Sequence, residues 1–213
     1  MKKSIFVLVV VFALVAGAPA QTPKYKYEIT KFGAPFPNAT GQPRDTVSVA
    51  ADGKGSILVL RRSDPPVLIY NREGKLLSSW GTGLFVDTHN IDVDRFGFVW
   101  IGDRNGQMVY KFTMDGKLLM SIGTKGVKGD DTSKTSFNRA SDVFVAPNGD
   151  IFVADGYENH RIVQFTKDGK VIDRIGGLQV EAHQATRDSG TGALYLADTG
   201  APGGMIWKVV IKK

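Results

Sequence analysis

Short apolar runs recur along the chain and are separated by polar turns. Residues 99–103 (Val-Trp-Ile-Gly-Asp) match residues 151–155 (Ile-Phe-Val-Ala-Asp), and weaker copies end at Arg61 and Asp198. The last positions of the four copies lie 42, 52 and 43 residues apart. A fixed period of this size is typical of architectures that repeat one supersecondary unit. No segment after the first twenty residues shows sustained helical periodicity, so the repeated unit is predicted to consist of strands.

Each copy continues into a second apolar run, which leads to a turn that contains glycine. The pairs Glu73-Gly74, Asp115-Gly116 and Asp168-Gly169 lie between apolar runs and are each followed by Lys. Glycine adopts a positive φ without steric cost, so these pairs predict hairpins. A third run follows each turn and ends in glycine at Gly81, Gly123 and Gly176.

Short strands, glycine turns and a period near 45 residues predict an all-β fold, a β-propeller of four-stranded blades. We expect four blades, at about residues 34–81, 82–123, 124–176 and 177–213. The last copy lacks this outer run, while residues 25–33 end in Phe-Gly and resemble the outer runs of other copies. We therefore expect this N-terminal strand to join the last blade and close the ring, which would cover an open sheet edge.

The first twenty residues are predicted to form a signal peptide. Lys2 and Lys3 precede an apolar run at residues 5–16, and Ala18-Pro19-Ala20 has the small-x-small pattern of a cleavage site. The run is shorter than the roughly 20 residues that span a bilayer. We expect a single secreted or periplasmic domain at residues 21–213, without stable membrane insertion after cleavage. An uncleaved anchor is the alternative.

Charge and cysteine content exclude some classes of protein. The net charge of +6 comes from basic residues that are scattered among acidic ones, as at residues 167–170. Scattered charge is typical of a solvated surface, so no nucleic-acid partner is expected. The chain has no Cys, and an exported fold without disulfides must be stabilised by its own core.

The repeats resemble NHL repeats, and one blade resembles a specific enzyme family. Residues 137–157, which end in Asp155-Gly156-Tyr157, and residues 159–165 are similar to a blade of the peptidyl-α-hydroxyglycine α-amidating lyases. Residues 62–68 and 83–89 resemble the bacterial lyase-like proteins. The resemblance covers roughly residues 45–176 well and the last blade loosely. It implies a propeller, which in that family has six blades.

The resemblance also implies a metal site on the propeller axis. In that family an ion, usually zinc, is held by histidines from alternate blades, and calcium lies nearby as a structural ion. His89 matches the first metal histidine, and His183 lies at the same place in its own blade. Ile91 matches the residue whose backbone carbonyl would reach calcium. Tyr157 matches the active-site tyrosine, and Arg62 matches the arginine of the first blade.

This sequence departs from the family pattern. It holds four blades of chain, Thr199 stands where the second arginine is expected, and Thr46 and Ser141 occupy the histidine slots of the other copies. Two histidines are fewer than the three protein ligands of a catalytic zinc. Asp87 and Glu181 each precede a histidine by two residues, so both are candidate ligands or orienting groups. The alternative is that both histidines only end inner strands near solvent.

Two functions follow from these residues. The first is a secreted, metal-dependent carbon–nitrogen lyase that cleaves a peptidyl-α-hydroxyglycine, or a small amide of this kind, and releases glyoxylate. Its metal would polarise the substrate hydroxyl, Tyr157 would act as a base or hydrogen-bond donor, and Arg62 would pair with a carboxylate or carbonyl. The second is a non-catalytic NHL propeller that binds a peptide, glycan or protein partner, because propellers host unrelated functions. A degraded gene copy is a third alternative. His160 is expected to be exposed.

Overall fold

The computed structural model describes residue 32 and residues 45–177, 181–187, 193–200 and 204–210. These residues form fifteen β-strands, and no helix is present among them. A helix long and apolar enough to cross a membrane is accordingly absent from this part of the chain. The predicted signal peptide lies outside the described residues and stays a prediction.

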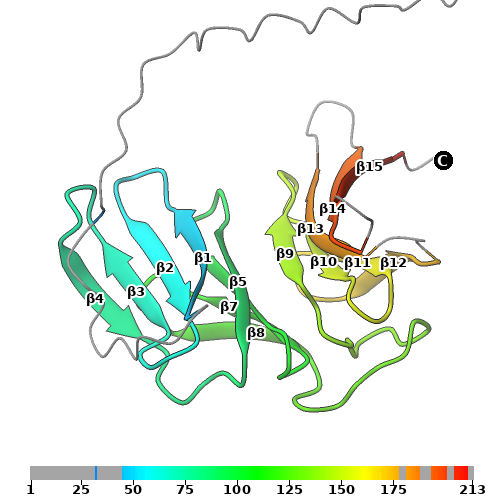
Figure 1. Cartoon of the computed structure of the whole chain (residues 1–213), viewed down its shortest axis with the longest axis horizontal. Coiled ribbons are helices and arrows are strands. Elements are labelled where there is room, and N and C mark those ends of the chain that lie inside the picture. Colours follow the sequence, from blue (N-terminus) through cyan, green and yellow to red (C-terminus); the bar gives the residue numbers. More distant parts are fainter. Residues whose placement is uncertain (1–31, 33–44, 178–180, 188–192, 201–203, 211–213) are drawn as a thin grey trace, which may run out of the picture. The chain divides into compact units, whose positions relative to one another are not determined.

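Four antiparallel sheets follow one another along the chain, and each sheet is one blade (Figure 1). The strands of the first two blades are β1 (Thr46–Ala51), β2 (Ile57–Arg61), β3 (Val67–Tyr70), β4 (Leu76–Trp80), β5 (Thr88–Val93), β6 (Val99–Asp103), β7 (Met108–Phe112) and β8 (Leu118–Gly123). Those of the last two are β9 (Asp142–Val145), β10 (Ile151–Asp155), β11 (Arg161–Phe165), β12 (Val171–Ile175), β13 (Ala182–Arg187), β14 (Leu194–Asp198) and β15 (Met205–Val209).

The first strand of each blade is its inner strand. Strands β1 and β5, β5 and β9, and β9 and β13 contact in succession, and one cavity is lined by residues of all four. The predicted all-β fold, a propeller of about four blades, is confirmed.

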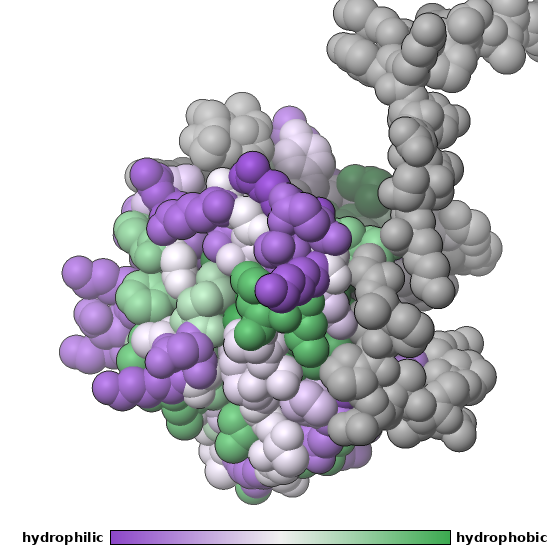
Figure 2. All heavy atoms as spheres, turned by 90° about the vertical axis from the view of Figure 1, so that its left-hand side faces the viewer, coloured by the Kyte–Doolittle hydropathy of each residue, from purple (hydrophilic) through white to green (hydrophobic). Residues whose placement is uncertain are grey.

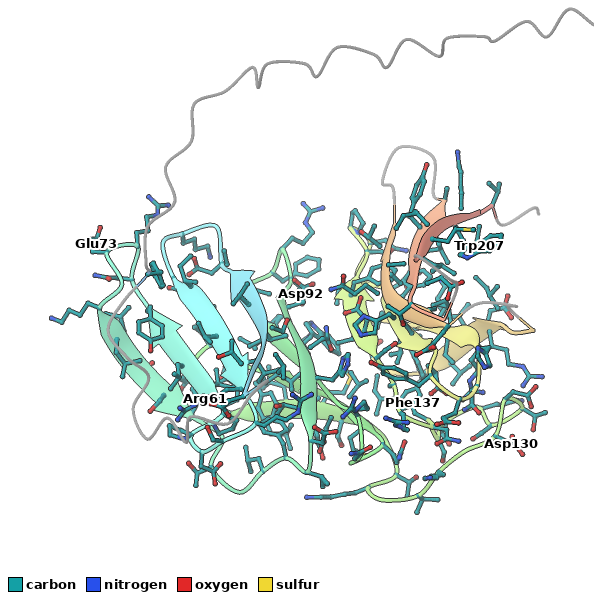
Figure 3. The ribbon with its side chains drawn as sticks, in the orientation of Figure 1. Arg61, Glu73, Asp92, Asp130, Phe137 and Trp207 are labelled. Atoms are coloured by element: carbon teal, nitrogen blue, oxygen red, sulfur yellow. The ribbon has the colours of Figure 1, made fainter. Side chains whose placement is uncertain are left out.

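The core lies between the blades rather than within a separate layer. One buried cluster joins blades 1 and 2, a second joins blades 2 and 3, and a third joins blades 3 and 4. Phe137 belongs to the second cluster and is labelled in Figure 3. A sheet that is covered on both faces needs apolar residues at every position, which explains why β6 and β10 are buried throughout instead of alternating.

The predicted hairpins are present at the outer ends of the first three blades. Gly74, Gly116 and Gly169 have φ angles of 78°, 89° and 76°, the left-handed region that glycine adopts without strain. The outer strands that follow these turns are largely exposed. Figure 2 views the side that carries β4 and shows hydrophobic and hydrophilic residues intermixed there, without one continuous apolar surface.

Blade 4 differs from the other three. Its described sheet has three strands, and β15, which carries Trp207 (Figure 3), is mostly exposed. Ile206 is 68% exposed, whereas Ile162 at the equivalent position of β11 is 1% exposed. In blades 1 to 3 this face is covered by the following blade. In blade 4 it borders a hollow of about 320 Å³ that includes Tyr195 and Ile206.

The expected closing strand, residues 25–33, lies outside the described residues except for Phe32. The Phe32 ring lies 5.8 Å from the Tyr70 ring of blade 1. Trp80, which ends the outer strand of blade 1, lies 5.0 Å from Phe112, the equivalent of Tyr70 in blade 2. Phe32 therefore contacts blade 1 as the end of an outer strand contacts the next blade. Pairing of the closing strand with β15 stays a prediction.

Ile162 and Ile206 occupy equivalent positions in blades 3 and 4, so substituting each one tests whether the face of blade 4 is exposed in solution. Ile162 pairs with Ala154, and Ile206 pairs with Ala197. Because only Ile162 is buried, Ile162→Ala is expected to lower the free energy of unfolding by about 3 kcal/mol and Ile206→Ala by less than about 1 kcal/mol. Chemical denaturation of both variants measures this difference. Equal losses would mean that a further segment or molecule covers blade 4 in solution.

Candidate functional site

Both predicted metal histidines lie on β-bulges of inner strands. The pairing of β5 with β6 slips between Thr88 and Asn90, and that of β13 with β14 slips between Ala182 and Gln184. A bulge places one unpaired residue in the strand and re-aims its side chain. The bulged residues are the two histidines, and their ring centroids lie 5.1 Å apart. The structure thus brings together imidazoles that are 94 residues apart in sequence.

The residue of blade 1 that is equivalent to the two histidines differs from the one expected from the sequence. The pairing of β1 with β2 slips between Thr46 and Ser48, so Val47 is the bulged residue and the assignment of Thr46 was wrong. The repeat spacing itself indicates Val47, because Val47 lies 14 residues before Arg61 as His89 lies 14 residues before Asp103. In blade 3 the equivalent residue is Ser141, as expected, and its single hydroxyl hydrogen has the carbonyl oxygens of Ala182, at 2.6 Å, and Ala154, at 3.0 Å, as possible acceptors.

Repeated aspartates hold the loops that lead into the two bulges. The Asp103 carboxylate accepts the backbone N–H groups of Val86 and Asp87 at 3.0 and 2.7 Å. The Asp198 carboxylate accepts the N–H of Glu181 at 3.1 Å. Each of these aspartates ends the second strand of its blade, so the sequence repeat that makes the strands also fixes the approach to each histidine.

The hydrogen bonds of His89 determine which ring nitrogen carries the proton. Nδ1 lies 2.7 Å from the carbonyl oxygen of Ser141, which can only accept, so Nδ1 is protonated. Nε2 therefore accepts a hydrogen bond from the hydroxyl of Tyr157, whose Oη lies 3.0 Å away. Burial lowers the pKa of His89 to about 4, and electrostatic interactions with His183 and Arg104 act in the same direction, whereas the hydrogen bond to Ser141 opposes the shift. The imidazole is neutral at physiological pH.

His183 and Tyr157 complete a group of three rings. Tyr157 lies 5.5 Å from His89 and 5.6 Å from His183 between ring centroids. Burial lowers the pKa of His183, while the Glu181 carboxylate opposes that shift. The two histidines line an axial cavity of about 250 Å³, together with residues of blades 1 and 3.

Tyr157 reaches the axis because of the glycine that precedes it. A Cβ atom at Gly156 would lie 2.1 Å from the backbone oxygen of Ala182 in β13, so only glycine permits this approach of blade 4. Two guanidinium groups face the Tyr157 ring, with Arg139 Cζ at 5.0 Å and Arg104 Cζ at 5.7 Å from its centroid. The Asp-Gly-Tyr sequence is therefore a structural requirement of the site.

Asp87 holds two arginines and is not directed at the histidines. Its Oδ1 accepts Arg62 Nε at 2.8 Å, and its Oδ2 accepts Arg104 Nη2 at 2.6 Å and Asn105 Nδ2 at 2.8 Å. Burial favours protonation of Asp87, but the hydrogen bonds and charges of the two arginines outweigh it and lower its pKa. Sequence reasoning missed Arg104. The signal was available, because Arg104 follows the end of its second strand as Arg62 does in blade 1.

The residues fit a zinc-type ion in donor chemistry. Histidine ligands usually donate their second nitrogen to a carbonyl or carboxylate, as His89 donates to Ser141. Two imidazoles and the Tyr157 hydroxyl are the nearby donors. Within the described part of the chain, no three His, Cys, Asp or Glu side chains are grouped to hold a metal.

The fit to calcium is poorer. Ile91 is buried between blades 1 and 2 and lies at a second axial cavity of about 250 Å³, beside Asp92 and Asp142. Burial raises the pKa of Asp142 to about 7, with a further contribution from Asp92. Both Asp142 oxygens already accept hydrogen bonds, from Asn90 and from the backbone of Ala185. Calcium takes six to eight oxygen ligands, which these groups do not supply.

Comparison with known proteins agrees with this fold. The NHL repeat family matches residues 137–165. A probable peptidyl-alpha-hydroxyglycine alpha-amidating lyase of Caenorhabditis elegans is 38% identical over 116 residues, which are 54% of this chain and 33% of that protein. NHL repeat-containing protein 3 of Homo sapiens is 29% identical over 174 residues, which are 73% of this chain and 49% of that protein.

A solved structure of streptogramin B lyase superposes with a TM-score of 0.59 at 12% identity, over 84% of this chain and 57% of the other, which shows the fold alone. The chain thus spans about a third to a half of the length of these relatives. It is confirmed as a propeller with an NHL repeat in blade 3 and sequence similarity to the amidating lyases.

Proposed function

We propose that this propeller is a carbon–nitrogen lyase of the amidating type. Its substrate would be the carbinolamide of a peptide or small amide, and its products would be the amide and glyoxylate. The observation that carries the proposal is the meeting of the His89, His183 and Tyr157 rings, from three different blades, beside the axial cavity that the two histidines line. Similarity to amidating lyases over about half of the chain supports the same reaction class.

The reaction moves one proton and breaks one bond. The substrate hydroxyl loses its proton, its C–O bond becomes C=O, and the C–N electron pair leaves with nitrogen, which takes up a proton. In this proposal Tyr157, whose ring lies beside both histidine rings, would act at the substrate hydroxyl as a hydrogen-bond donor, or as a base once its own proton has left. An ion held by His89 and His183 would supply Lewis-acid polarisation of the hydroxyl oxygen.

Arg62 is the group placed to orient the substrate. It lines the axial cavity, its side chain is 33% exposed, and its Nε is fixed by Asp87. A guanidinium in this position forms charge-assisted hydrogen bonds to the carboxylate that every α-hydroxyglycine carries. Substrate binding by Arg62 and proton transfer by Tyr157 would thus use separate residues on separate blades.

A second function remains supported by one observation. The match to NHL repeat-containing protein 3 covers more of this chain than the match to the nematode lyase, at 73% against 54%. A non-catalytic propeller that binds a peptide, glycan or protein partner would need neither metal nor base. Metal content separates the two proposals.

The metal prediction compares all three histidines of the chain. Purified wild-type protein is expected to hold one zinc-type ion, and His89→Ala and His183→Ala are each expected to lose it, together with at least about 100-fold of the glyoxylate release. His160→Ala is the control, because His160 is exposed, and should retain the ion. Elemental analysis and a glyoxylate assay measure both quantities. Metal-free wild-type protein that melts cooperatively and releases no glyoxylate would favour the binding module.

The neutral state of His89 has a measurable consequence in the metal-free protein. The unfolded chain takes up this proton near pH 6.5, and the folded chain only near pH 4, so acidification favours the unfolded state across that window. After allowance for solvent screening, wild-type protein is expected to lose about 2 kcal/mol more than His89→Gln between these pH values. Urea denaturation at both values measures it. Identical losses in the two proteins would contradict a buried, neutral imidazole.

A further inference from the structure

We propose that a groove between blades 2 and 3 binds a sugar that carries a carboxylate, as in an acidic polysaccharide. The groove has a volume of about 460 Å³ and is lined by the hairpin that follows β5 and by two turns of blade 3. This size lies within the roughly 300–1,000 Å³ that is usual for small-ligand sites. His89 lies near the start of β5, whereas the groove begins after the end of that strand. The groove shares no residue with the axial cavity, so this proposal does not depend on the lyase reaction.

Aromatic side chains of blade 2 form one wall of the groove. Phe96, Phe98 and Trp100 line it, and Phe96 is 54% exposed. Asp94 holds this wall in place. Its Oδ1 accepts the backbone N–H groups of Phe96 and Phe98 at 2.9 and 3.0 Å, and its Oδ2 accepts Trp100 Nε1 at 2.8 Å. Aromatic faces fixed in this way can pack against the C–H bonds of a sugar ring without ordering a mobile loop.

Lys111 places a positive charge over the aromatic wall. Its Nζ lies 4.0 Å from the centroid of the Phe98 ring and 5.3 Å from that of the Trp100 ring, and the lysine is half-buried. Lys167, from a turn of blade 3, adds a second ammonium group to the groove. Neither lysine forms an ion pair with any side chain that the structure describes. Two ammonium groups beside exposed aromatic rings favour a ligand that is anionic and has an apolar face.

The polar group on the blade 3 side of the groove favours a sugar over an acidic peptide. Asp168 lines the groove there and is exposed. A carboxylate can only accept hydrogen bonds, so Asp168 would repel the side chains of an acidic peptide but accept from sugar hydroxyl groups. A sugar with one carboxylate supplies hydroxyl donors for Asp168 and an acceptor for Lys111 and Lys167.

Lys208 provides a matched comparison in blade 4. It pairs across strands with Tyr195 as Lys111 pairs with Trp100, and its Nζ lies 5.7 Å from the Tyr195 ring centroid. Lys208 is exposed, and no further blade follows it in the described part of the chain. The same pair of lysine and aromatic ring therefore occurs once with a facing wall and once without it. The two lysines separate binding in the groove from a general effect of surface charge.

The binding test is calorimetric titration of the purified protein with trigalacturonate, neutral trigalactose and triglutamate. Trigalacturonate is expected to bind, and Lys111→Gln should weaken its binding about 10-fold, because a charge-assisted hydrogen bond is lost. Phe96→Ala should weaken it about 5-fold through loss of the aromatic wall. The control, Lys208→Gln, should stay within about 2-fold.

The exposed Lys167 keeps this test independent of folding. Because its side chain is not part of the core, Lys167→Gln should leave the melting temperature unchanged and still weaken binding of trigalacturonate about 3-fold. Equal affinity for trigalactose would overturn recognition of the carboxylate, and equal affinity for triglutamate would overturn recognition of the sugar. Folded wild-type protein that does not bind trigalacturonate would overturn the proposal as a whole.

A second measurement locates the bound sugar. The chain has three tryptophans, of which Trp100 lines the groove, while Trp80 lies on β4 and Trp207 on β15. With 5-fluorotryptophan incorporated, trigalacturonate is expected to shift the fluorine NMR resonance of Trp100 and to leave the other two unchanged. A shift of the Trp207 resonance alone would place the sugar on the exposed face of blade 4 and overturn the assignment to the groove.

Discussion

Contact between neighbouring sheets is the constraint on which the rest of this structure depends. Each blade is too thin to bury its own apolar residues, so the side chains of β6 and β10 are covered only when a blade lies on either side. The same packing sets the angle at which inner strands approach the axis. The distances between His89, His183 and Tyr157 are therefore consequences of core packing in three separate blades.

Charge at the site is organised around neutral imidazoles. Burial keeps both histidines uncharged, while Asp87 gathers Arg62 and Arg104 on one side of the cavity. A neutral nitrogen lone pair and permanent cations thus lie within a few side chains of each other. Neutral imidazoles beside two guanidinium groups favour the binding of an anionic substrate. Among the described side chains, the carboxylate nearest to these arginines, that of Asp87, is already paired with them.

The sequence was sufficient for the repeats, the hairpins and the meeting of the two histidines, because each depends on a local pattern repeated at a fixed period. Gly74, Gly116 and Gly169 have the predicted positive φ. The position in blade 1 was misassigned by one residue, although Val47 has the same 14-residue spacing to Arg61 as His89 has to Asp103. The roles of Asp87 and Arg104 also escaped prediction. The repeat position after the second strand could have indicated Arg104, but the contact of Asp87 with Arg62 joins loops of different blades and depends on three-dimensional packing.

Because one face of blade 4 is exposed, the blades that carry the site residues are not equally stabilised by packing. His89 and Tyr157 stand on blades that have neighbours on both sides, whereas His183 stands on the sheet whose β15 is open to solvent. In a linear array of repeats, a terminal unit has one stabilising interface instead of two, and local opening begins where stabilisation is least. Among the described residues, the sheet that carries His183 therefore has the least packing support of the sheets that form the site.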